Sequence, residues 1–417
     1  MPAKKQSAAP ADTAGSLVVP GFRHFGGFHH ETANLANLLA FHGVVAPHTR
    51  KPYSEEMLLG LGGGIGCAYF VFEMCDGVHL YVGGRHGLEG TKGEFAKRAV
   101  GRVGAKARVL ETGGAKGAEA NLRAALEDGH PAILWLGQAG LPYHGLPIEL
   151  LGYLMYTVLA YGIDESKGVA LLSDRSKKPV SATLAELSAA RARIGSLKNR
   201  SMTIAPPAKA IDLKKSVSDA LKDTVHALRG GTIANFGLSA LVKWADLLGN
   251  EREKKGWPTL SKDGRAQYTL LKSAFHAIET SGTGGSAFRM MFARFLGEAS
   301  DVLRKPGLRS AAAIYGEAAC HWAGVALAAL PDSAPRLKET RELLLERRRL
   351  LEEEGMGGLA AMKKSRDRLA AIEAEAAREP ILAVGAARAL REELATRLKK
   401  LHEAETRALA GLEAEVR

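Results

Sequence analysis

The segment GFHHETANLANLLAFHGV, residues 27–44, places His30 at the start of an expected helix. A helix N-terminus lowers the pKa of a cysteine nucleophile through its dipole and its free N–H groups. A cysteine acyl-transfer site adds a histidine base on a nearby strand and an acid that orients this base. Residue 30 opens the first helix, Tyr156 begins the strand-like run YTVLAYGID, and Asp174 ends the run VALLSD. The layout therefore follows the plan of a cysteine acyl-transfer site.

Helices and short strands share the first half of the chain. Leucines on one face predict a helix over 32–41, and Ser54 is the expected N-cap of a second helix. The runs CAYFVFEM and VHLYVG, separated by Cys75, Asp76 and Gly77, predict a β-hairpin. The segments that follow are a helix near 93–103, the strand ARVLETG, the helix GAEANLRAALEDG and the strands PAILWLG, YTVLAYGID and GVALLSD. We therefore expect helices first and an antiparallel sheet after them.

The composition changes at APPAKAIDLKK, residues 205–215, and helical periodicity dominates beyond it, for example over 234–248. The predicted fold class is α+β. We divide the chain into a disordered tail (1–20), a mixed N-terminal domain (21–207), an all-α domain (208–332) and a charged region of two long helices (333–417). Leucines seven residues apart in the last region favour either a helical hairpin within the chain or a coiled coil with a second subunit.

A net charge of +12 raises the question of anionic partners, but the basic clusters are scattered and are not interleaved with aromatic residues. This pattern disfavours nucleic acid as a partner. Cys67, Cys75 and Cys320 include no CxxC pair, which argues against a disulfide framework and a zinc knuckle. Because no apolar run has the length of a membrane span or the form of a secretion signal, we expect a cytoplasmic protein.

Several segments, taken in order over residues 22–330, resemble the family of butirosin biosynthesis protein H. They are FHHETANLANLLAFHGV, SEEMLLGLGGGIGCAYFVFE, LPYHGLP, YTVLAYGID and LLSDR in the first half, and SGTGGSAFRMMFARFLGEA and IYGEAACHWAGVA in the second. The resemblance implies an N-terminal domain similar to papain-like and bacteriocin-processing cysteine peptidases, followed by a helical domain of uncharacterised function. For the founding member it implies a cysteine-dependent acyltransferase that moves an acyl group from a carrier-protein thioester to an aminoglycoside amine.

The family pattern has His-Cys where this sequence has His29 and His30, and it has the histidine base where this sequence has Tyr156. Only Asp174 matches. A phenol with a pKa of about 10 is a poor proton carrier at neutral pH. We therefore predict a catalytically silent binding or assembly protein. The alternative is an active acyltransferase or amidase of natural-product biosynthesis with a rearranged site.

Two residues are candidate substitutes in such a rearranged site. Cys67 follows a glycine-rich loop, where a buried small residue is the commoner interpretation, and His144 lies in the loop LPYHGLP. A histidine pair with Asp174 also suggests a metal, but adjacent residues seldom aim both imidazoles at one ion. We therefore predict no metal and no cofactor.

The expected binding residues lie beside the degenerate site and at a second-domain glycine turn. His29, Glu31 and Arg175 flank the three site positions, and Arg289 follows the turn SGTGGS. The turn with Arg289 is suited either to an anion or to a structural connection between helices. As partners we expect an acidic carrier protein, a peptide or small amide ligand, and further copies of the chain that assemble through the C-terminal helices.

Overall fold

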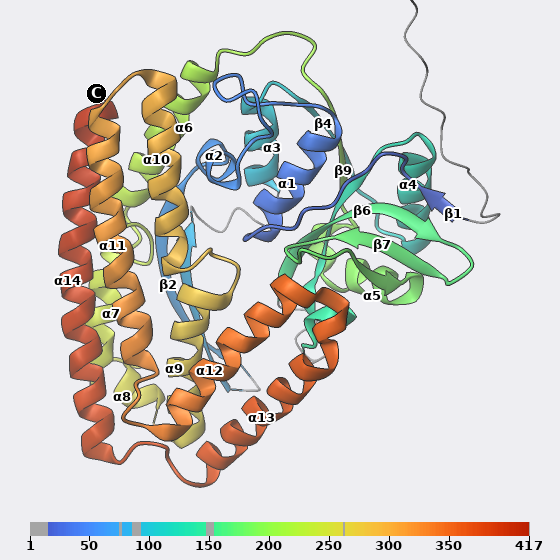
Figure 1. Cartoon of the computed structure of the whole chain (residues 1–417). Coiled ribbons are helices and arrows are strands. Elements are labelled where there is room, and N and C mark those ends of the chain that lie inside the picture. The colour runs from blue at the N-terminus through green and yellow to red at the C-terminus, as the bar shows by residue number, and fades with distance from the viewer. Residues whose placement is uncertain (1–15, 75–76, 86–92, 147–153, 262, 417) are drawn as a thin grey trace, which may run out of the picture.

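A computed structural model describes the chain as an antiparallel sheet region followed by a largely helical region, so the predicted α+β class is confirmed (Figure 1). The described residues are 16–74, 77–85, 93–146, 154–261 and 263–416. The expected turn at Cys75 and Asp76 and most of the expected N-terminal tail lie outside these residues.

Seven described strands form one antiparallel sheet in the order β4-β9-β5-β6-β7-β8, and β1 pairs with β6. The apolar runs of β5 and β6 are largely buried at its centre. The strands are β1 (Ser16–Val18), β4 (Lys106–Leu110), β5 (Ala132–Gly137), β6 (Met155–Asp164), β7 (Val169–Ser173), β8 (Val180–Thr183) and β9 (Ser201–Ala205). The prediction of a disordered tail over 1–20 is therefore wrong for Ser16–Val18, because backbone pairing with β6 orders these three residues.

Five described helices accompany the sheet. They are α1 (His30–Phe41), α2 (Glu55–Leu61), α3 (Glu94–Arg102), α4 (Ala115–Glu127) and α5 (Leu184–Arg193). The first contacts β6 and begins two residues before the expected start at Thr32. The second has the predicted cap, since the Ser54 hydroxyl accepts a hydrogen bond from the backbone N–H of Met57 at 3.0 Å. The short helical turns of this half are η2 (Gln138–Gly140), η3 (Pro142–His144) and η5 (Gly195–Leu197).

The predicted hairpin, β2 (Ile65–Met74) with β3 (Gly77–Arg85), is a separate two-stranded ribbon that lies against the helical region. The free edge of β2 is extended by the segment before α7 (Ser239–Gly249), where the N–H of Tyr69 donates to the carbonyl of Asn235 at 3.0 Å. This pairing explains why α7 begins later than the predicted 234. The carbonyl of Asn235 and the N–H of Gly237 bond to Tyr69 and Cys67 of the ribbon, and the segment is not helical.

The remaining helices pack into a bundle in which α11 and α14 run side by side (Figure 1). The elements are α6 (Leu213–Arg229), α8 (Trp257–Leu260), α9 (Gly264–Phe275), the π-helical turn η6 (His276–Thr280), η7 (Ser286–Phe288), α10 (Arg289–Leu303), α11 (Gly307–Ala329) and α14 (Val384–Val416). The heptad leucines Leu394, Leu398 and Leu401 are fully buried within the chain. No described helix is both long enough and apolar enough to span a bilayer.

The segment before α14 forms a helical hairpin of its own. Its arms are α12 (Pro335–Arg349) and α13 (Leu359–Arg378), and its tip consists of η8 (Leu350–Glu354) and η9 (Gly355–Gly358). The long helices after 333 were expected to pair with each other or with a second subunit. Instead α12 pairs with α13, and α14 packs against α11 and α7. The glycine-containing interruption EEEGMGG reverses the chain, since the positive φ of Gly355 suits a tight turn.

Candidate functional site

The structure brings the three predicted site residues together. His30 is the first residue of α1, Tyr156 is the second residue of β6, and Asp174 directly follows β7. The rings of His30 and Tyr156 stack with their centroids 4.1 Å apart. The Tyr156 hydroxyl donates to Oδ1 of Asp174 at 2.9 Å. Helix α1 therefore presents residue 30 to the strand that carries residue 156, as the sequence predicts.

Asp174 is fully buried and accepts four hydrogen bonds. Oδ1 accepts from the hydroxyl of Tyr156 and, at 2.7 Å, from the backbone N–H of Arg175. Oδ2 accepts from the hydroxyl of Tyr143 at 3.0 Å and from Nε2 of His144 at 3.1 Å. Burial pushes the pKa of Asp174 upward, but the donors and the charge of Arg175 outweigh it and hold this pKa at about 2. The ionised carboxylate has used its acceptor positions and has none left to orient a further base.

The loop histidine His144, one of the candidate substitutes, does join the site. Its ring lies edge-on to Tyr156, with centroids 4.9 Å apart. Nε2 bonds to Asp174, and Nδ1 lies 3.3 Å from the side-chain amide nitrogen of Gln138. An amide nitrogen is a donor, so Nδ1 is the acceptor and Nε2 carries the proton. Both nitrogens are therefore engaged, and the ring has no lone pair directed at a substrate.

His30 is held in one tautomer by Thr157. The backbone N–H of Thr157 donates to Nδ1 of His30 at 3.1 Å, and the Thr157 hydroxyl lies 2.8 Å from the same nitrogen. Nδ1 must accept, so in the neutral ring the proton is on Nε2. Burial lowers the pKa of His30 well below 6.5, and the charge of Arg85 lowers it further. The imidazole is thus neutral, and its basic nitrogen is already used.

A partly buried carboxylate that the sequence analysis did not single out holds the N-terminus of α1. Glu55 accepts hydrogen bonds from the backbone N–H of Phe28 at 2.7 Å, the N–H of His29 at 3.1 Å and the hydroxyl of Thr32 at 2.6 Å. Burial raises the pKa of Glu55 to about 7, although these three donors oppose the rise. Negative charge is favourable at a helix N-terminus, so Glu55 stabilises the segment that leads into α1.

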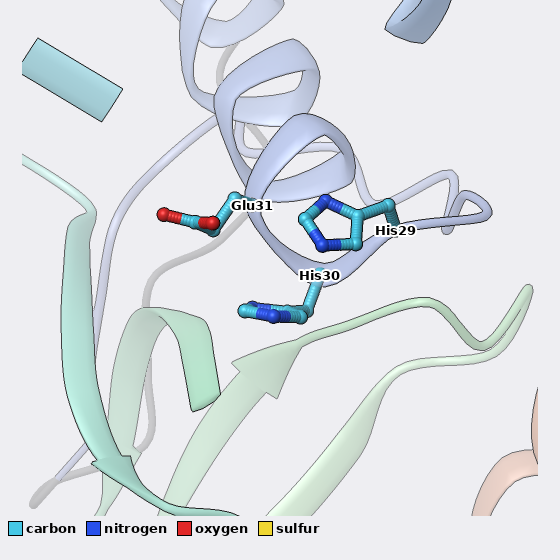
Figure 2. A group of neighbouring side chains, drawn as sticks. All are labelled: His29, His30 and Glu31. Carbon is cyan, nitrogen blue, oxygen red and sulfur yellow. The ribbon is translucent and has the colours of Figure 1, made fainter. Parts of the chain in front are cut away.

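Figure 2 shows His29, His30 and Glu31 gathered at the first turn of α1. One ligand atom from each lies within 4.8 Å of the others, and the two imidazole centroids are 4.4 Å apart. Adjacent residues seldom aim both imidazoles at one point, but the two rings of this pair do lie together. The donor set nevertheless suits a cation poorly. The nitrogen of His30 that remains for a ligand carries a proton, and Arg85 already binds one oxygen of Glu31.

Arg175 belongs to the same cluster. Its Nε donates to the hydroxyl of Tyr156 at 3.0 Å, and its Nη1 lies 3.9 Å from a carboxylate oxygen of Glu352 in η8. Burial and the charge of Asp174 raise the pKa of Tyr156, whereas Arg175 lowers it. Burial dominates and raises the pKa of Tyr156 well above 10, although Arg175 opposes the rise. The phenol in the base position is therefore neutral over the physiological pH range.

Arg289 and Cys67 lie in a second buried cluster, away from His30. Nε of Arg289 donates to Oε1 of Glu405 at 2.6 Å, and Nη2 donates to the carbonyl of Gly66 at 2.9 Å and lies 3.0 Å from Sγ of Cys67. Nη1 donates to the carbonyl oxygens of Gly84 and Ala287. These contacts satisfy the guanidinium within the chain and join the ribbon, α10 and α14. Arg289 therefore has the structural role that the sequence left open beside anion binding.

Cys67 has the properties of a core thiol. The residue is 4% exposed, and burial raises the pKa of its thiol to about 12 even though Arg289 is adjacent. A thiolate is the reactive form of cysteine, and burial in this cluster suppresses it. The other described cysteine, Cys320, is exposed on α11.

The tip of the α12–α13 hairpin packs against the loops that carry His144 and Asp174. The backbone N–H of Lys177 donates to the carbonyl of Glu352 at 2.7 Å, and Nη2 of Arg347 donates to the carbonyl of His144 at 3.0 Å. Leu350, Leu351 and Met362 share a buried cluster with Tyr143 and Tyr156. Figure 1 shows the tip of this hairpin beside the sheet region. The C-terminal part of the chain therefore helps to close the site.

Several residues of this network escaped the sequence analysis, namely Thr157, Tyr143, Gln138, Asn34 and Glu55. A partial signal existed for Asn34, because an asparagine within the apolar face of α1 is unusual and needs a hydrogen-bond partner. Its side-chain amide donates to the carbonyl of Thr157 at 3.0 Å. For the others no local pattern marks a role, and the partners of Thr157, Tyr143 and Glu55 lie more than twenty residues away in the sequence.

Two family models match the chain. The model described as butirosin biosynthesis protein H, N-terminal, matches residues 29–175, and a model described as a domain of unknown function matches residues 184–359. The first match begins at His29 and ends at Arg175, and so covers the three site positions. No curated protein matches the chain.

Proposed function

Because the chain belongs to the butirosin biosynthesis protein H family, with the N-terminal domain of that family followed by the domain of unknown function, we propose that it is a catalytically silent relative of the cysteine acyltransferases. It keeps the site's scaffold and uses it for binding or assembly. Its net charge of +12 supports an acidic carrier protein as a partner, since opposite charges speed encounter.

The observation that carries the proposal is the saturated carboxylate of Asp174. In an active relay the acid orients a histidine, and the histidine exchanges a proton with the nucleophile. Here Asp174 accepts from two tyrosines, one imidazole and one backbone N–H, and the residue between Asp174 and position 30 is the neutral phenol of Tyr156. The path for a proton therefore ends at a group that does not accept one near neutral pH.

The candidate substitutes offer little support for a rearranged site. Both nitrogens of His144 are engaged, and the thiol of Cys67 is buried against Arg289. His30 as a nucleophile would need the lone pair that already accepts from Thr157. Each alternative therefore requires breaking a buried hydrogen bond before chemistry begins, at a cost of about 1–3 kcal/mol.

The decisive experiment incubates the purified full chain with panels of acyl thioesters and amides. We expect no turnover above that of buffer. Turnover that disappears in a His30→Ala or Asp174→Ala variant would refute the proposal. A double variant, H30C/Y156H, places thiol and imidazole at the two altered positions, and we expect the introduced thiol to acquire an acyl group from a thioester. The single variant H30C is the matched control, because it provides the thiol without the base.

A further inference from the structure

Buried polar atoms without a hydrogen-bond partner among the described residues gather at the start of α1. Helix α1 and its N-cap residue contribute Nδ1 of His29, Oε1 of Glu31 and Oδ1 of Asn34, and two arginines contribute Nη1 of Arg85 and Nη1 of Arg175. His29, Glu31, Asn34 and Arg175 are each at most 5% exposed. Native proteins leave few buried polar groups unpaired, and such groups commonly face a bound water or ligand.

These atoms belong to one region of the molecule. Arg85 binds Glu31 through its other terminal nitrogen, and the carbonyl of Arg175 accepts from the backbone N–H of Gly27 at 3.1 Å. The ligand atoms of His29, His30 and Glu31 lie within 4.8 Å of one another (Figure 2). Burial lowers the pKa of both imidazoles, and the charges of the two arginines lower it further, so both rings are neutral.

The charges of this region restrict which class of ligand, cationic, anionic or uncharged, can bind there. Two guanidinium groups face carboxylates here: Arg85 binds Glu31, and Nη1 of Arg175 lies 3.9 Å from a carboxylate oxygen of Glu352. A cation would face both arginines and the Nε2–H of His30. A carboxylate would face the free oxygens of Glu31 and Asn34. The unpaired set contains donors and acceptors together, so it suits an uncharged group that has one of each.

We propose that the first turn of α1 binds an uncharged amide group, whose N–H donates to Oε1 of Glu31 and whose carbonyl accepts from Nε2 of His30 and from the arginines. This inference rests on the proposed function, because a silent site holds an amide without cleaving it. An amide pairs donors and acceptors that otherwise remain unsatisfied, whereas an ester of the same shape leaves the acceptor of Glu31 unpaired.

The test follows the imidazole nitrogens of His29 and His30 by NMR in the full chain labelled with ¹⁵N-histidine. The probes are N-methylpropanamide, methyl propanoate, propanoate and zinc chloride, each added alone. We expect saturable shifts with the amide and at least about ten-fold weaker binding of the ester, because a site built for an N–H group rejects an analogue that lacks it.

Variants check that the shifts report this site. Glu31→Gln should weaken amide binding about ten-fold, since it removes the charged acceptor. Glu392→Gln removes a carboxylate of an exposed pair on α14 and should change nothing. If the Glu31→Gln chain fails to fold, Arg85→Lys takes its place: it keeps a positive charge for Glu31 but removes the unpaired Nη1, and it should also weaken amide binding about ten-fold.

Four outcomes would overturn the inference, namely equal binding of amide and ester, preference for propanoate, stoichiometric binding of zinc, or no shift with any probe. Its failure is distinguishable from failure of the proposed function. Amide binding followed by cleavage would leave the inference standing and refute catalytic silence. Absence of both binding and turnover would refute amide binding and leave the proposal of catalytic silence standing.

Discussion

Tyr156 donates a hydrogen bond to Oδ1 of Asp174 across 2.9 Å, and both side chains are buried. A carboxylate that would orient an imidazole in a cysteine acyltransferase here binds a phenol. The same hydroxyl accepts from Nε of Arg175, so one oxygen joins an anion and a cation. The contact stabilises the fold, and under the function proposed above it also interrupts the proton relay at the same atom.

Replacing Tyr156 with phenylalanine should lower the free energy of unfolding by about 1–3 kcal/mol. The variant leaves Nε of Arg175 without its acceptor and removes one donor from Asp174, and unpaired buried charged groups are costly. Denaturant titration at pH 7 measures the change. Tyr161→Phe is the matched control, since Tyr161 is only partly buried and stacks on Phe22 through its ring, which the variant keeps. Equal stability of the two variants would contradict the prediction.

The stability of the protein should carry a pH dependence that comes from Glu55. The pKa of Glu55 is about 7 in the folded chain, against an ordinary value of 4.5, because burial disfavours its charge. Between these values the folded chain binds more protons than the unfolded chain, so stability falls as pH rises through this window.

The Glu55 prediction is measured as a difference between two chains, which cancels the contributions of all other groups. Unfolding free energies of wild type and Glu55→Gln are compared from pH 4 to pH 8. We expect wild type to lose stability relative to the variant as pH rises from about 4.5, with most of the change complete by pH 8. A difference that stays flat or rises with pH would show that Glu55 titrates normally.

Cys67 should resist alkylation in the native protein. Its thiol is buried and the pKa is raised to about 12, so the reactive thiolate is scarce at pH 8, whereas Cys320 is exposed. Treatment with iodoacetamide followed by peptide mass spectrometry separates the two sites. We expect Cys320 to be modified within minutes and Cys67 only after denaturation. Rapid modification of Cys67 would instead support a rearranged active site.

The Arg289–Glu405 pair should be a major contributor to the stability of the helical region. Both residues are fully buried, and Oε1 of Glu405 also accepts from the indole N–H of Trp322 at 2.7 Å. Glu405→Leu leaves the guanidinium charge buried and unpaired, at an expected cost of about 3–5 kcal/mol. The double variant R289M/E405L removes both charges and should cost clearly less. If denaturant titration gave additive losses, the two residues would not be acting as a pair.

Local patterns predicted much of the fold. The cap at Ser54 and the ribbon of β2 and β3 depend on contacts between residues close in sequence, and both are present. Helix α1 is also present, although it begins two residues before the predicted start. The pairing of the C-terminal helices was harder to predict, because heptad leucines are equally suited to any apolar partner. The structure buries them against α11 and α7.

The sequence by itself determined that the site positions hold His30, Tyr156 and Asp174, because residue identity and spacing along regular elements require no knowledge of packing. Only the tertiary structure decided their chemical state. Asp174 forms hydrogen bonds with Tyr143 and His144, which lie about thirty residues away in the sequence. Nδ1 of His30 accepts a hydrogen bond from Thr157, which lies 127 residues away. Burial and such distant partners set the proton positions and the pKa values, and no short segment of sequence contains either.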